Sequence, residues 1–278
     1  MTRPVSAAPG GALGLRSGRV KAARQLGKKA FRERGRSFLA EGPQAVREAL
    51  RAPGVVTELF VTGQGQARHP DLAAQAAGQG VPVHEVGAEA MAEIAQTVTP
   101  QGLLAVCRFI DVPLDALADA QPRLVAILAS VRDPGNAGTV LRTADAAGAD
   151  GVVFSAASVD PYNAKCVRSS AGSLFHLPVV AGPALTEVID AVRAAGLQVL
   201  AADGRASQVL DDPASGPDLT LPTAWLFGNE AWGLPDDLRA LADAVVAVPI
   251  YGQAESLNLA AAAAVCMYAS ARHARGRP

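Results

Sequence analysis

The chain has 278 residues, of which 50% are hydrophobic, 4% aromatic and 18% charged, and its formal net charge is −1. This length allows one large α/β domain or two modest ones, and the apolar half of the composition excludes a disordered polar chain and a collagen-like repeat. No uninterrupted apolar run approaches about 18 residues, so we expect no membrane-spanning helix. The basic amino-terminal segment lacks the apolar core of a secretory signal.

The cysteines and histidines argue against a disulfide framework and against a metal site. The cysteines are Cys107, Cys166 and Cys266, which are widely spaced and odd in number. This pattern predicts reduced thiols in a cytoplasmic protein. The four histidines show no metal-ligand spacing, so we expect no bound metal.

The charge is distributed very unevenly along the chain. Residues 1–36 carry ten basic groups and one acidic group, Glu33, which leaves 15 basic and 25 acidic groups in residues 37–278. The net charge is therefore +9 at one end and −10 over the rest. Such asymmetry predicts a nucleic-acid-binding arm on an acidic body, and the alternative is a solubilising tail.

In chain order, the first predicted feature is residues 1–23, the first part of the basic arm at 1–36, which we expect to be disordered because it is rich in Gly, Ala, Pro and Arg without an apolar period. A small α/β domain is predicted over residues 24–110. Its expected helices are 42–51, 70–79 and 88–96, and its expected strands are 57–62, 81–86 and 102–109. Residues 111–122, rich in Asp, Pro and Ala, predict a linker.

Strands and helices alternate regularly from residue 123 to residue 275. The expected strands are 124–130, 151–155, 178–181, 198–202, 224–227 and 245–249, and the expected helices are 138–147, 164–174, 185–195, 236–244 and 257–272. Continuous apolar strands that alternate with helices predict a mostly parallel sheet covered on both faces. Ligands bind beyond the carboxyl ends of such strands, so the turns found there are the candidate sites.

The first of three unusual turns follows the strand at 124–130. Its Pro-Gly-Asn segment predicts a tight loop, and Gly138 opens a helix that carries Arg142 one turn inside it. An arginine near a helix amino terminus suits an anionic or phosphate-bearing ligand. The alternative is an ordinary loop with a surface arginine.

The second turn, residues 226–235, follows a buried strand and contains two glycines, Glu230 and Trp232. Glycine lets a ligand approach the backbone closely, and Glu230 can accept hydrogen bonds from amino or hydroxyl groups. Alternatively, Glu230 caps the helix at 236–244.

The third turn, residues 248–260, precedes a helix of small apolar residues. Ser256 or Glu255 could be its N-cap, which would leave the Asn258 amide to hold a ligand. Alternatively, Asn258 caps the local backbone.

Taken together, the three turns resemble the signature motifs of a known family. The matching segments are Asn136-x-Gly138-x-x-x-Arg142-Thr-Ala, Phe227-Gly228-Asn229-Glu230-x-x-Gly233-Leu234 and Ser256-Leu257-Asn258. Further similarity lies at residues 160–173, 38–42 and 99–102. The family is the SpoU (TrmH) family of RNA ribose methyltransferases, part of the SPOUT superfamily, and the resemblance covers about residues 24–273.

The resemblance implies an S-adenosylmethionine-dependent RNA ribose-2′-O-methyltransferase that acts as a homodimer. Residues 123–275 would form an α/β domain with a deep trefoil knot, an exception to the rule against threaded loops. Residues 24–110 would form an RNA-binding domain similar to a ribosomal-protein fold. We favour 23S ribosomal RNA as substrate. The alternatives are transfer RNA, base methylation as in another SPOUT branch, and a non-catalytic RNA-binding ribosome assembly factor.

The resemblance also assigns candidate residues to each role. The catalytic candidates are Arg142, Asn136, Glu230 and Asn258. The cofactor-binding candidates are Ala202, Asp203, Gly204, Phe227, Gly228, Asn229, Gly233, Ile250, Ser256, Leu257 and Asn258. The RNA-binding candidates are Arg24, Lys28, Lys29, Arg32, Arg36, Arg132, Arg142, Lys165 and Arg168.

Each catalytic candidate has an expected role. Because arginine stays protonated, we expect Arg142 to stabilise the developing alkoxide rather than act as a base. Asn136 would position the ribose or Arg142, Glu230 would bond Arg142 or the partner subunit, and Asn258 would order the cofactor loop. Trp232 departs from the family pattern without removing a polar catalytic group.

Overall fold

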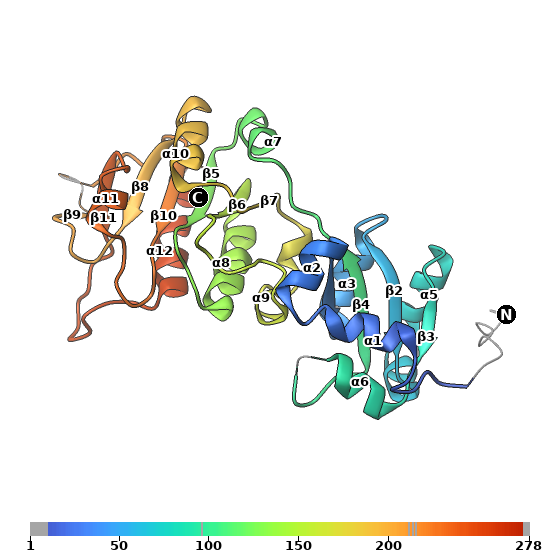
Figure 1. Ribbon diagram of the computed structural model, residues 1–278. Helices are drawn as coiled ribbons and strands as arrows, with labels where there is room; N and C mark the ends of the chain where they lie inside the picture. Colours follow the sequence, from blue (N-terminus) through green and yellow to red (C-terminus); the bar gives the residue numbers. More distant parts are fainter. Residues whose placement is uncertain (1–10, 96, 211, 213, 215, 275–278) are drawn as a thin grey trace. The chain divides into compact units, whose positions relative to one another are not determined.

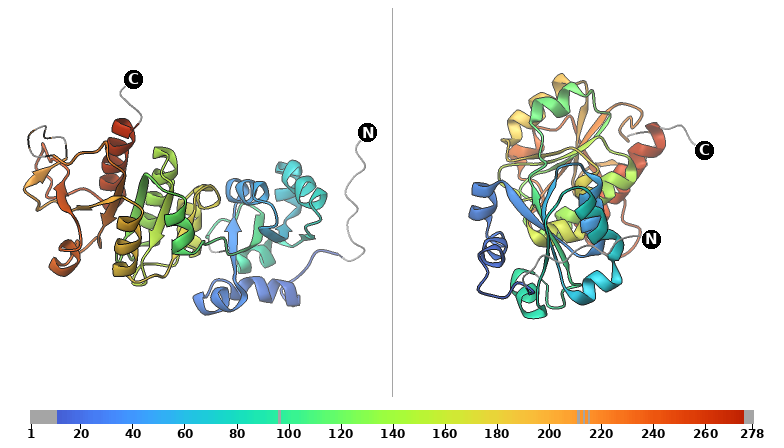
Figure 2. Two further views of the ribbon diagram at one scale, coloured as in Figure 1. Left: turned by 90° about the horizontal axis from the view of Figure 1, so that it is seen from above. Right: turned by 90° about the vertical axis from the view of Figure 1, so that its right-hand side faces the viewer.

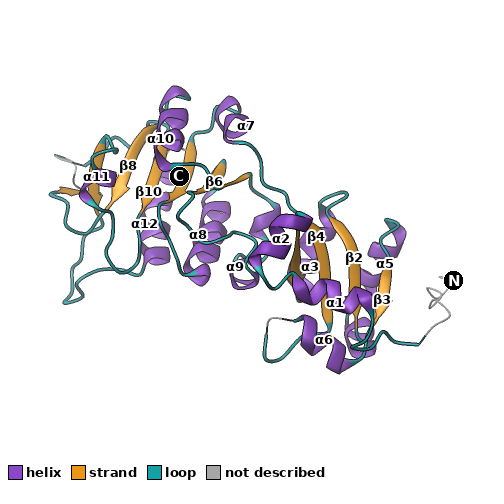
Figure 3. Cartoon of the chain, viewed as in Figure 1, coloured by secondary structure: helices purple, strands orange, loops and turns teal. Residues whose placement is uncertain are grey.

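A computed structural model describes residues 11–95, 97–210, 212, 214 and 216–274. The chain divides into two compact units. The first unit holds the residues up to Ile110 together with Tyr162–Phe175, and the second holds Asp111–Pro161 together with the residues from His176 onward. Figure 1 labels the helices and strands along the chain, and Figure 3 distinguishes the two kinds of element by colour.

The first unit is built on a mixed four-stranded sheet in the order β1-β4-β2-β3. Strand β4 is antiparallel to both β1 and β2, whereas β2 and β3 are parallel. The strands are β1 (Ser37–Glu41), β2 (Val56–Val61), β3 (Val83–Glu85) and β4 (Leu103–Arg108). The helices are α1 (Gly18–Gln25), α2 (Lys29–Gly35), α3 (Pro43–Arg51), α4 (Gly63–Arg68), α5 (Pro70–Gly78), α6 (Ala88–Ile94) and α9 (Ala164–Ser169), with a 3-10 turn at Ser173–Phe175.

The second unit contains a seven-stranded sheet in the order β7-β6-β5-β10-β8-β11-β9, in which every neighbouring pair is parallel. The strands are β5 (Leu124–Leu128), β6 (Gly151–Phe154), β7 (Val179–Ala181), β8 (Gln198–Ala202), β9 (Gln208–Val209), β10 (Thr223–Phe227) and β11 (Ala244–Ala247). The helices are α7 (Leu114–Asp119), α8 (Pro134–Ala147), α10 (Leu185–Ala194), α11 (Asp236–Arg239) and α12 (Leu259–Ala274). The predicted parallel sheet is confirmed.

The central strands β5 and β10 of this sheet are buried along their whole length because helices cover both faces. All five residues of β5 and all five of β10 are buried, as expected for strands without a solvent face. Figure 2 shows α7 and α10 on one face and α8 and α12 on the other. In register, Phe227 of β10 lies opposite Leu128 of β5 and Ala202 of β8, so the turns that follow these strands leave the same edge of the sheet.

The structure corrects the expected disorder of the basic arm for the part that it describes. Helix α1 begins at Gly18, and its Val20 and Ala23 pack into an apolar core with Met91 and Ile94 of α6. Leu13 also donates its backbone N–H to the Glu85 carbonyl, at 2.8 Å. Residues 1–10 lie outside the described range. The sequence did not predict α1 because only Val20 and Ala23 of this helix are buried, too few apolar positions to show a helical period among the charged residues.

Other segments also differ from expectation: α8 begins at Pro134, before the expected start at 138, and α11 ends at Arg239, before the expected end at 244. The expected linker contains α7, whose Leu117 is 2% exposed and packs into the core of the second unit. The helix expected at 164–174 ends at Ser169, because Ala171 and Gly172 adopt positive φ values of 50° and 103°. It packs against β1 and belongs to the first unit. No described helix is both long and apolar enough to cross a membrane.

Candidate active site

A chain of hydrogen bonds joins the three motif turns at the carboxyl edge of the parallel sheet. Asn258 Nδ2, next to the start of α12, donates to Asn136 Oδ1 at 3.1 Å. Asn136 Nδ2, in the first turn of α8, donates to Glu230 Oε1 at 3.2 Å. Glu230 lies in the turn after β10. Three side chains from distant parts of the sequence therefore form one connected polar arrangement.

Glu230 holds the turn before α8 rather than bonding Arg142. Its carboxylate accepts from the backbone N–H groups of Asp133 at 3.3 Å and Arg132 at 3.5 Å. Asp133 is the N-cap of α8 and accepts from Asn136 N at 2.8 Å. Among the described residues Glu230 bonds these groups and not Arg142, and the expected bond to the partner subunit stays a prediction. The alternative that Glu230 caps the helix beginning at Asp236 is wrong, because Pro235 is the N-cap of α11 and no side chain caps it.

Asn229 fastens the turn after β10 to the turn after β5. It is only 6% exposed, its Nδ2 donates to the Ser130 carbonyl at 2.9 Å, and its Oδ1 accepts from Ala231 N at 2.9 Å. Ser130 adopts a positive φ of 59°, a conformation that non-glycine residues rarely adopt. The Asn229 side chain is thus engaged within the protein, where it ties the two turns together.

Glycines close the turn after β10 tightly. Backbone bonds run in both directions between Asn229 and Gly233, at 3.0 and 2.9 Å. A Cβ atom on Gly228 would lie 2.6 Å from the Gly233 carbonyl, and Gly233 itself has a φ of 69°. Position 228 therefore requires glycine, and the positive φ of Gly233 favours it. Phe227, which precedes this turn, is 1% exposed, so only its backbone borders the site.

Arg142 lies on the exposed side of α8, between Thr139 and Ala146, while Val140 and Leu141 are buried in the core. Its guanidinium forms no hydrogen bond or ion pair with any residue that the structure describes. A cation held on a rigid helix and not neutralised by a neighbour is available to an anionic ligand.

The third turn caps α12 with Asn258, so Ser256 and Glu255 are not the caps. Asn258 Oδ1 accepts from Ala260 N, and its carbonyl accepts from Ala262 N, both at 2.9 Å. The side chain thus caps the helix through its oxygen and contacts Asn136 through its nitrogen. Before it, Ser256 is exposed, and the apolar Ile250 and Leu257 remain 36% and 39% exposed.

Sequence reasoning missed an arginine cluster around Asp203, just after β8. Asp203 accepts from Arg205 N, Nε and Nη2 at 2.9, 3.1 and 2.8 Å, and from Arg239 Nη1 at 3.5 Å. These hydrogen bonds, above all that from the Arg205 side chain, hold the pKa of Asp203 below its ordinary value. The Asp-Gly-Arg spacing was the available signal for Arg205, whereas Arg239 gave none.

The Asp203 cluster predicts a pH-dependent stability. Asp203→Asn is expected to lower the free energy of unfolding by about 1–3 kcal/mol at neutral pH, because it removes charge-assisted hydrogen bonds. Since folding lowers the pKa of Asp203, its contribution is full above about pH 5 and is lost as the pH falls through the folded-state pKa. Urea unfolding of both proteins at pH 7, 5 and 3 tests this.

The matched control for this cluster is Asp237→Asn, at an exposed aspartate that forms no ion pair with a described residue. It should change stability little at any of the three pH values. A difference between wild type and Asp203→Asn that stayed the same from pH 7 to pH 3 would contradict the prediction.

The candidate RNA-binding cations lie in both units. Lys165 and Arg168 lie on α9 of the first unit, where Arg168 contacts Glu41 at 3.5 Å, and Arg132 and Arg142 are exposed in the second. In the arm, Arg24 pairs with Glu93 at 2.9 Å, Lys29 pairs with Glu33 at 3.6 Å, Lys28 is exposed and Arg36 lies over Phe109, 4.6 Å from its ring centroid.

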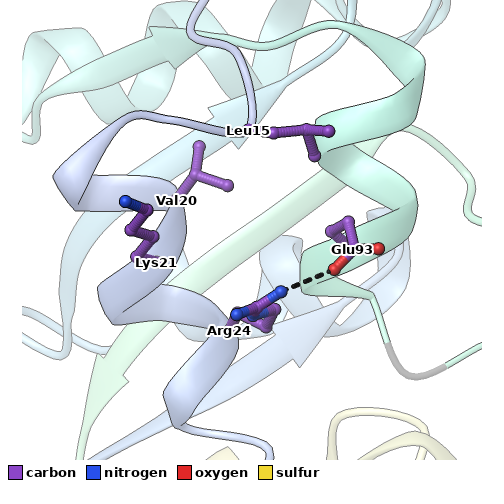
Figure 4. Close-up of a pocket in the computed structure, with 5 residues that line it drawn as sticks. All are labelled: Leu15, Val20, Lys21, Arg24 and Glu93. Carbon is purple, nitrogen blue, oxygen red and sulfur yellow. Dashed lines mark hydrogen bonds and ion pairs between the residues drawn. The ribbon is translucent and has the colours of Figure 1, made fainter.

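Arg32 is the one RNA-binding candidate of the described arm that the structure buries. Arg32 is 4% exposed and its Nη1 donates to the Leu26 and Gly27 carbonyls at 2.9 and 3.0 Å. It satisfies the carboxyl end of α1 instead of facing solvent. Figure 4 shows the neighbouring pocket between α1 and α6, in which Arg24 bonds Glu93. Among the described residues, no group of His, Cys, Asp and Glu side chains could hold a metal ion.

Comparison with known proteins identifies the family. Residues 123–268 match the model of the SpoU rRNA Methylase family, and residues 18–105 match the MRM3-like substrate binding domain. The chain is 38% identical over 263 residues to the 23S rRNA (guanosine(2553)-2′-O)-methyltransferase RlmP of Bacillus subtilis, covering 93% of this chain and 96% of that protein.

Solved structures are similar over most of the chain. The AdoMet-bound rRNA methyltransferase from Sinorhizobium meliloti has a TM-score of 0.79 at 32% identity, covering 95% of this chain and 99% of that one. The SpoU methyltransferase AviRb from Streptomyces viridochromogenes, in complex with AdoMet, has a TM-score of 0.79 at 30% identity, covering 92% and 98%. The resemblance carried by the three motif turns is thus confirmed, and the chain belongs to the SpoU rRNA methylase family.

Proposed function

We propose that this protein transfers the methyl group of S-adenosylmethionine to a ribose 2′-hydroxyl of 23S ribosomal RNA in the cytoplasm. The observation that carries the proposal is the hydrogen-bond chain from Asn258 through Asn136 to Glu230, which unites the three motif turns. The unneutralised Arg142 lies on the same helix as Asn136. The names of the relatives, RlmP among them, support the substrate.

The residues at this edge fit S-adenosylmethionine. The apolar side chains of Ile250 and Leu257 are left uncovered, which suits the faces of an adenine ring. The close approach of Gly228 to Gly233 fixes the turn after β10. The other residues that would bind the cofactor, through their backbone groups, are Ala202, Asp203, Gly204, Phe227, Asn229 and Ser256. When bound, the cofactor supplies an electrophilic methyl group on a sulfonium sulfur.

The protein's own contribution is to orient the ribose and stabilise charge. Arg142 stays protonated, so it acts by stabilising the negative charge that develops on the 2′-oxygen and by contacting an adjacent phosphate. Asn136 is fixed from both sides, by Asn258 and by Glu230. A rigid amide of this kind positions the attacking oxygen in line with the methyl group.

The proposal includes a trefoil knot and a homodimer. Support for the knot comes from β10, which lies between the earlier strands β5 and β8, and from α12, which returns over α8 and the sheet after β11. Support for the dimer comes from α12, where Val265 and Tyr268 are 38% and 46% exposed. An exposed apolar helix face of this kind suits a second copy of the chain.

The first unit binds the RNA backbone through the exposed cations of its arm. Replacing Lys28, Lys29 and Arg34 together with glutamine should weaken RNA binding. The slope of log affinity against log salt concentration should become shallower by about 2, because fewer counterions are released on binding when fewer phosphates are contacted. Binding titrations from low to high salt measure this. The buried Val20 and Ala23 make deletion of the arm unsuitable, because it would remove part of the core.

The control for the arm is the triple substitution of Arg47, Arg51 and Arg68 with glutamine. These cations lie on α3 and α4 of the same unit, and Arg47 and Arg51 are paired with carboxylates. Both triple variants lose three positive charges, but the salt slope of this control should stay like that of the wild-type protein. Equal slopes for the two triple variants and the wild type would show that the arm does not contact phosphate.

The decisive experiment maps ribose methylation in RNA from cells with and without this protein. The proposal expects one 2′-O-methyl group to disappear from 23S rRNA. Loss of a 2′-O-methyl group from transfer RNA alone, or of a base methyl group, would replace the proposed substrate. An unchanged methylation pattern, together with no S-adenosylmethionine binding in calorimetry, would favour a non-catalytic assembly factor.

A further inference from the structure

The turn after β10 presents an exposed tryptophan that the proposed chemistry does not use. Trp232 is 51% exposed. The other tryptophan, Trp225, is fully buried and donates to Ser270 Oγ at 2.8 Å. Trp232 contacts the cation of Arg132, whose guanidinium carbon lies 5.6 Å from the indole centroid. At this distance the guanidinium is attracted to the face of the indole, and half of the indole stays open to solvent.

The pair borders the polar chain of the site. Trp232 follows Glu230 by two residues, and Arg132 donates its backbone N–H to the same Glu230 carboxylate. Because Glu230 also accepts from Asn136, the Arg132 backbone is tied to the residues that orient the ribose, and Trp232 lies in the same turn as Glu230. A base on the indole would therefore lie close to the reacting nucleotide.

The chemistry of the pair matches unpaired RNA. Nucleobases in single strands stack on aromatic side chains, and neighbouring cations contact their phosphates. The Arg132 guanidinium forms no ion pair with a described carboxylate, so its charge is available to a phosphate. Arg142, on α8, is a second exposed cation without such a partner.

We propose that Trp232 and Arg132 form a stacking site for an unpaired base that flanks the methylated nucleotide. This inference rests on the proposed function. A second protomer is the competing occupant of the indole, but two exposed arginines, Arg132 and Arg142, that pair with no described carboxylate favour a polyanion.

Fluorescence tests the stacking directly, because Trp232 is the exposed one of the two tryptophans. Adding a short oligoadenylate should quench the emission of the wild-type protein, whereas an abasic oligonucleotide of equal length and charge should not. The Trp232→Phe protein should show no RNA-dependent change. Equal quenching by both oligonucleotides, or quenching that persists in Trp232→Phe, would overturn the proposal.

Kinetics separate stacking from a structural role. Trp232→Ala should raise KM for 23S rRNA about tenfold with kcat little changed, as expected for loss of one base–aromatic stack, and Trp232→Phe should recover most of the loss. Affinity for S-adenosylmethionine should be the same in all three proteins. The matched control is Leu221→Ala, which removes an apolar side chain that is 49% exposed at the amino end of β10.

Three outcomes would overturn the inference while leaving the proposed function intact. The first two are an unchanged KM for Trp232→Ala and a loss of activity in Trp232→Ala that is confined to kcat. The third is a molecular mass of Trp232→Ala in light scattering that is half that of the wild-type protein, which would place the indole at a contact between protomers. Failure of the proposed function is distinguishable, because the wild-type protein itself would then leave 23S rRNA unmethylated.

Discussion

Replacing Arg142 with alanine is expected to lower kcat for RNA methylation about 100- to 1,000-fold, the loss typical of removing one group that stabilises developing negative charge. Arg142 is exposed on α8, away from the core residues of that helix, so the fold should tolerate the change. Calorimetry should show unchanged affinity for S-adenosylmethionine. Single-turnover kinetics with 23S rRNA measure the effect on the methyl-transfer step.

Two further variants define what Arg142 does. Arg142→Lys keeps the charge but loses the planar fork that contacts a phosphate and an oxygen at once, so it should recover only a small part of the activity. Arg123→Ala removes an exposed arginine at the opposite edge of the same sheet, where its Nη2 donates to the Thr220 carbonyl at 3.3 Å. That variant should keep full activity. Near-normal turnover by Arg142→Ala would refute the assigned role.

Gly228→Ala is expected to disrupt the turn after β10 and to weaken S-adenosylmethionine binding about 5- to 150-fold, the effect of roughly 1–3 kcal/mol of steric strain. The added Cβ would lie 2.6 Å from the carbonyl carbon and oxygen of Gly233 and 2.7 Å from Leu234 Cγ. The backbone atoms of Gly233 cannot rotate away from the new Cβ as a flexible side chain could. The turn must therefore open, which would displace Glu230. Calorimetry with the cofactor and urea unfolding measure the two effects.

Gly252→Ala is the matched control, because a Cβ at that position would meet no atom within 4 Å. It should bind the cofactor and unfold like the wild-type protein. If Gly228→Ala did the same, the turn would be shown to adapt without cost, and its tight closure would not be needed for the site.

The sequence predicted the parallel sheet well because the signal is local. The strand β5, and β10 after Thr223, are continuous apolar runs, and a strand buried on both faces needs no alternation. It predicted less of the first unit. The strand β1 was recognised only as a family segment, and α1 was missed, because Val20 and Ala23 are its only buried residues among many charges.

The contacts within the site depend on residues far apart in the chain. Asn136 is 94 residues from Glu230 and 122 residues from Asn258. No local pattern encodes such a pairing. The same reason explains why Glu230 was paired with Arg142 in the sequence interpretation, whereas the fold turns its carboxylate to the backbone of Arg132 and Asp133.

The sequence by itself determined the class of fold, the family and the residue types of the three motif turns, because each is written in short segments of the chain. The tertiary structure alone decided which partners those residues have. It buried Arg32 against the end of α1, joined Arg239 to Asp203, and left Trp232 exposed beneath Arg132. Burial and hydrogen bonding are settled only when distant segments pack together, and the net charge of −1 reveals none of these arrangements.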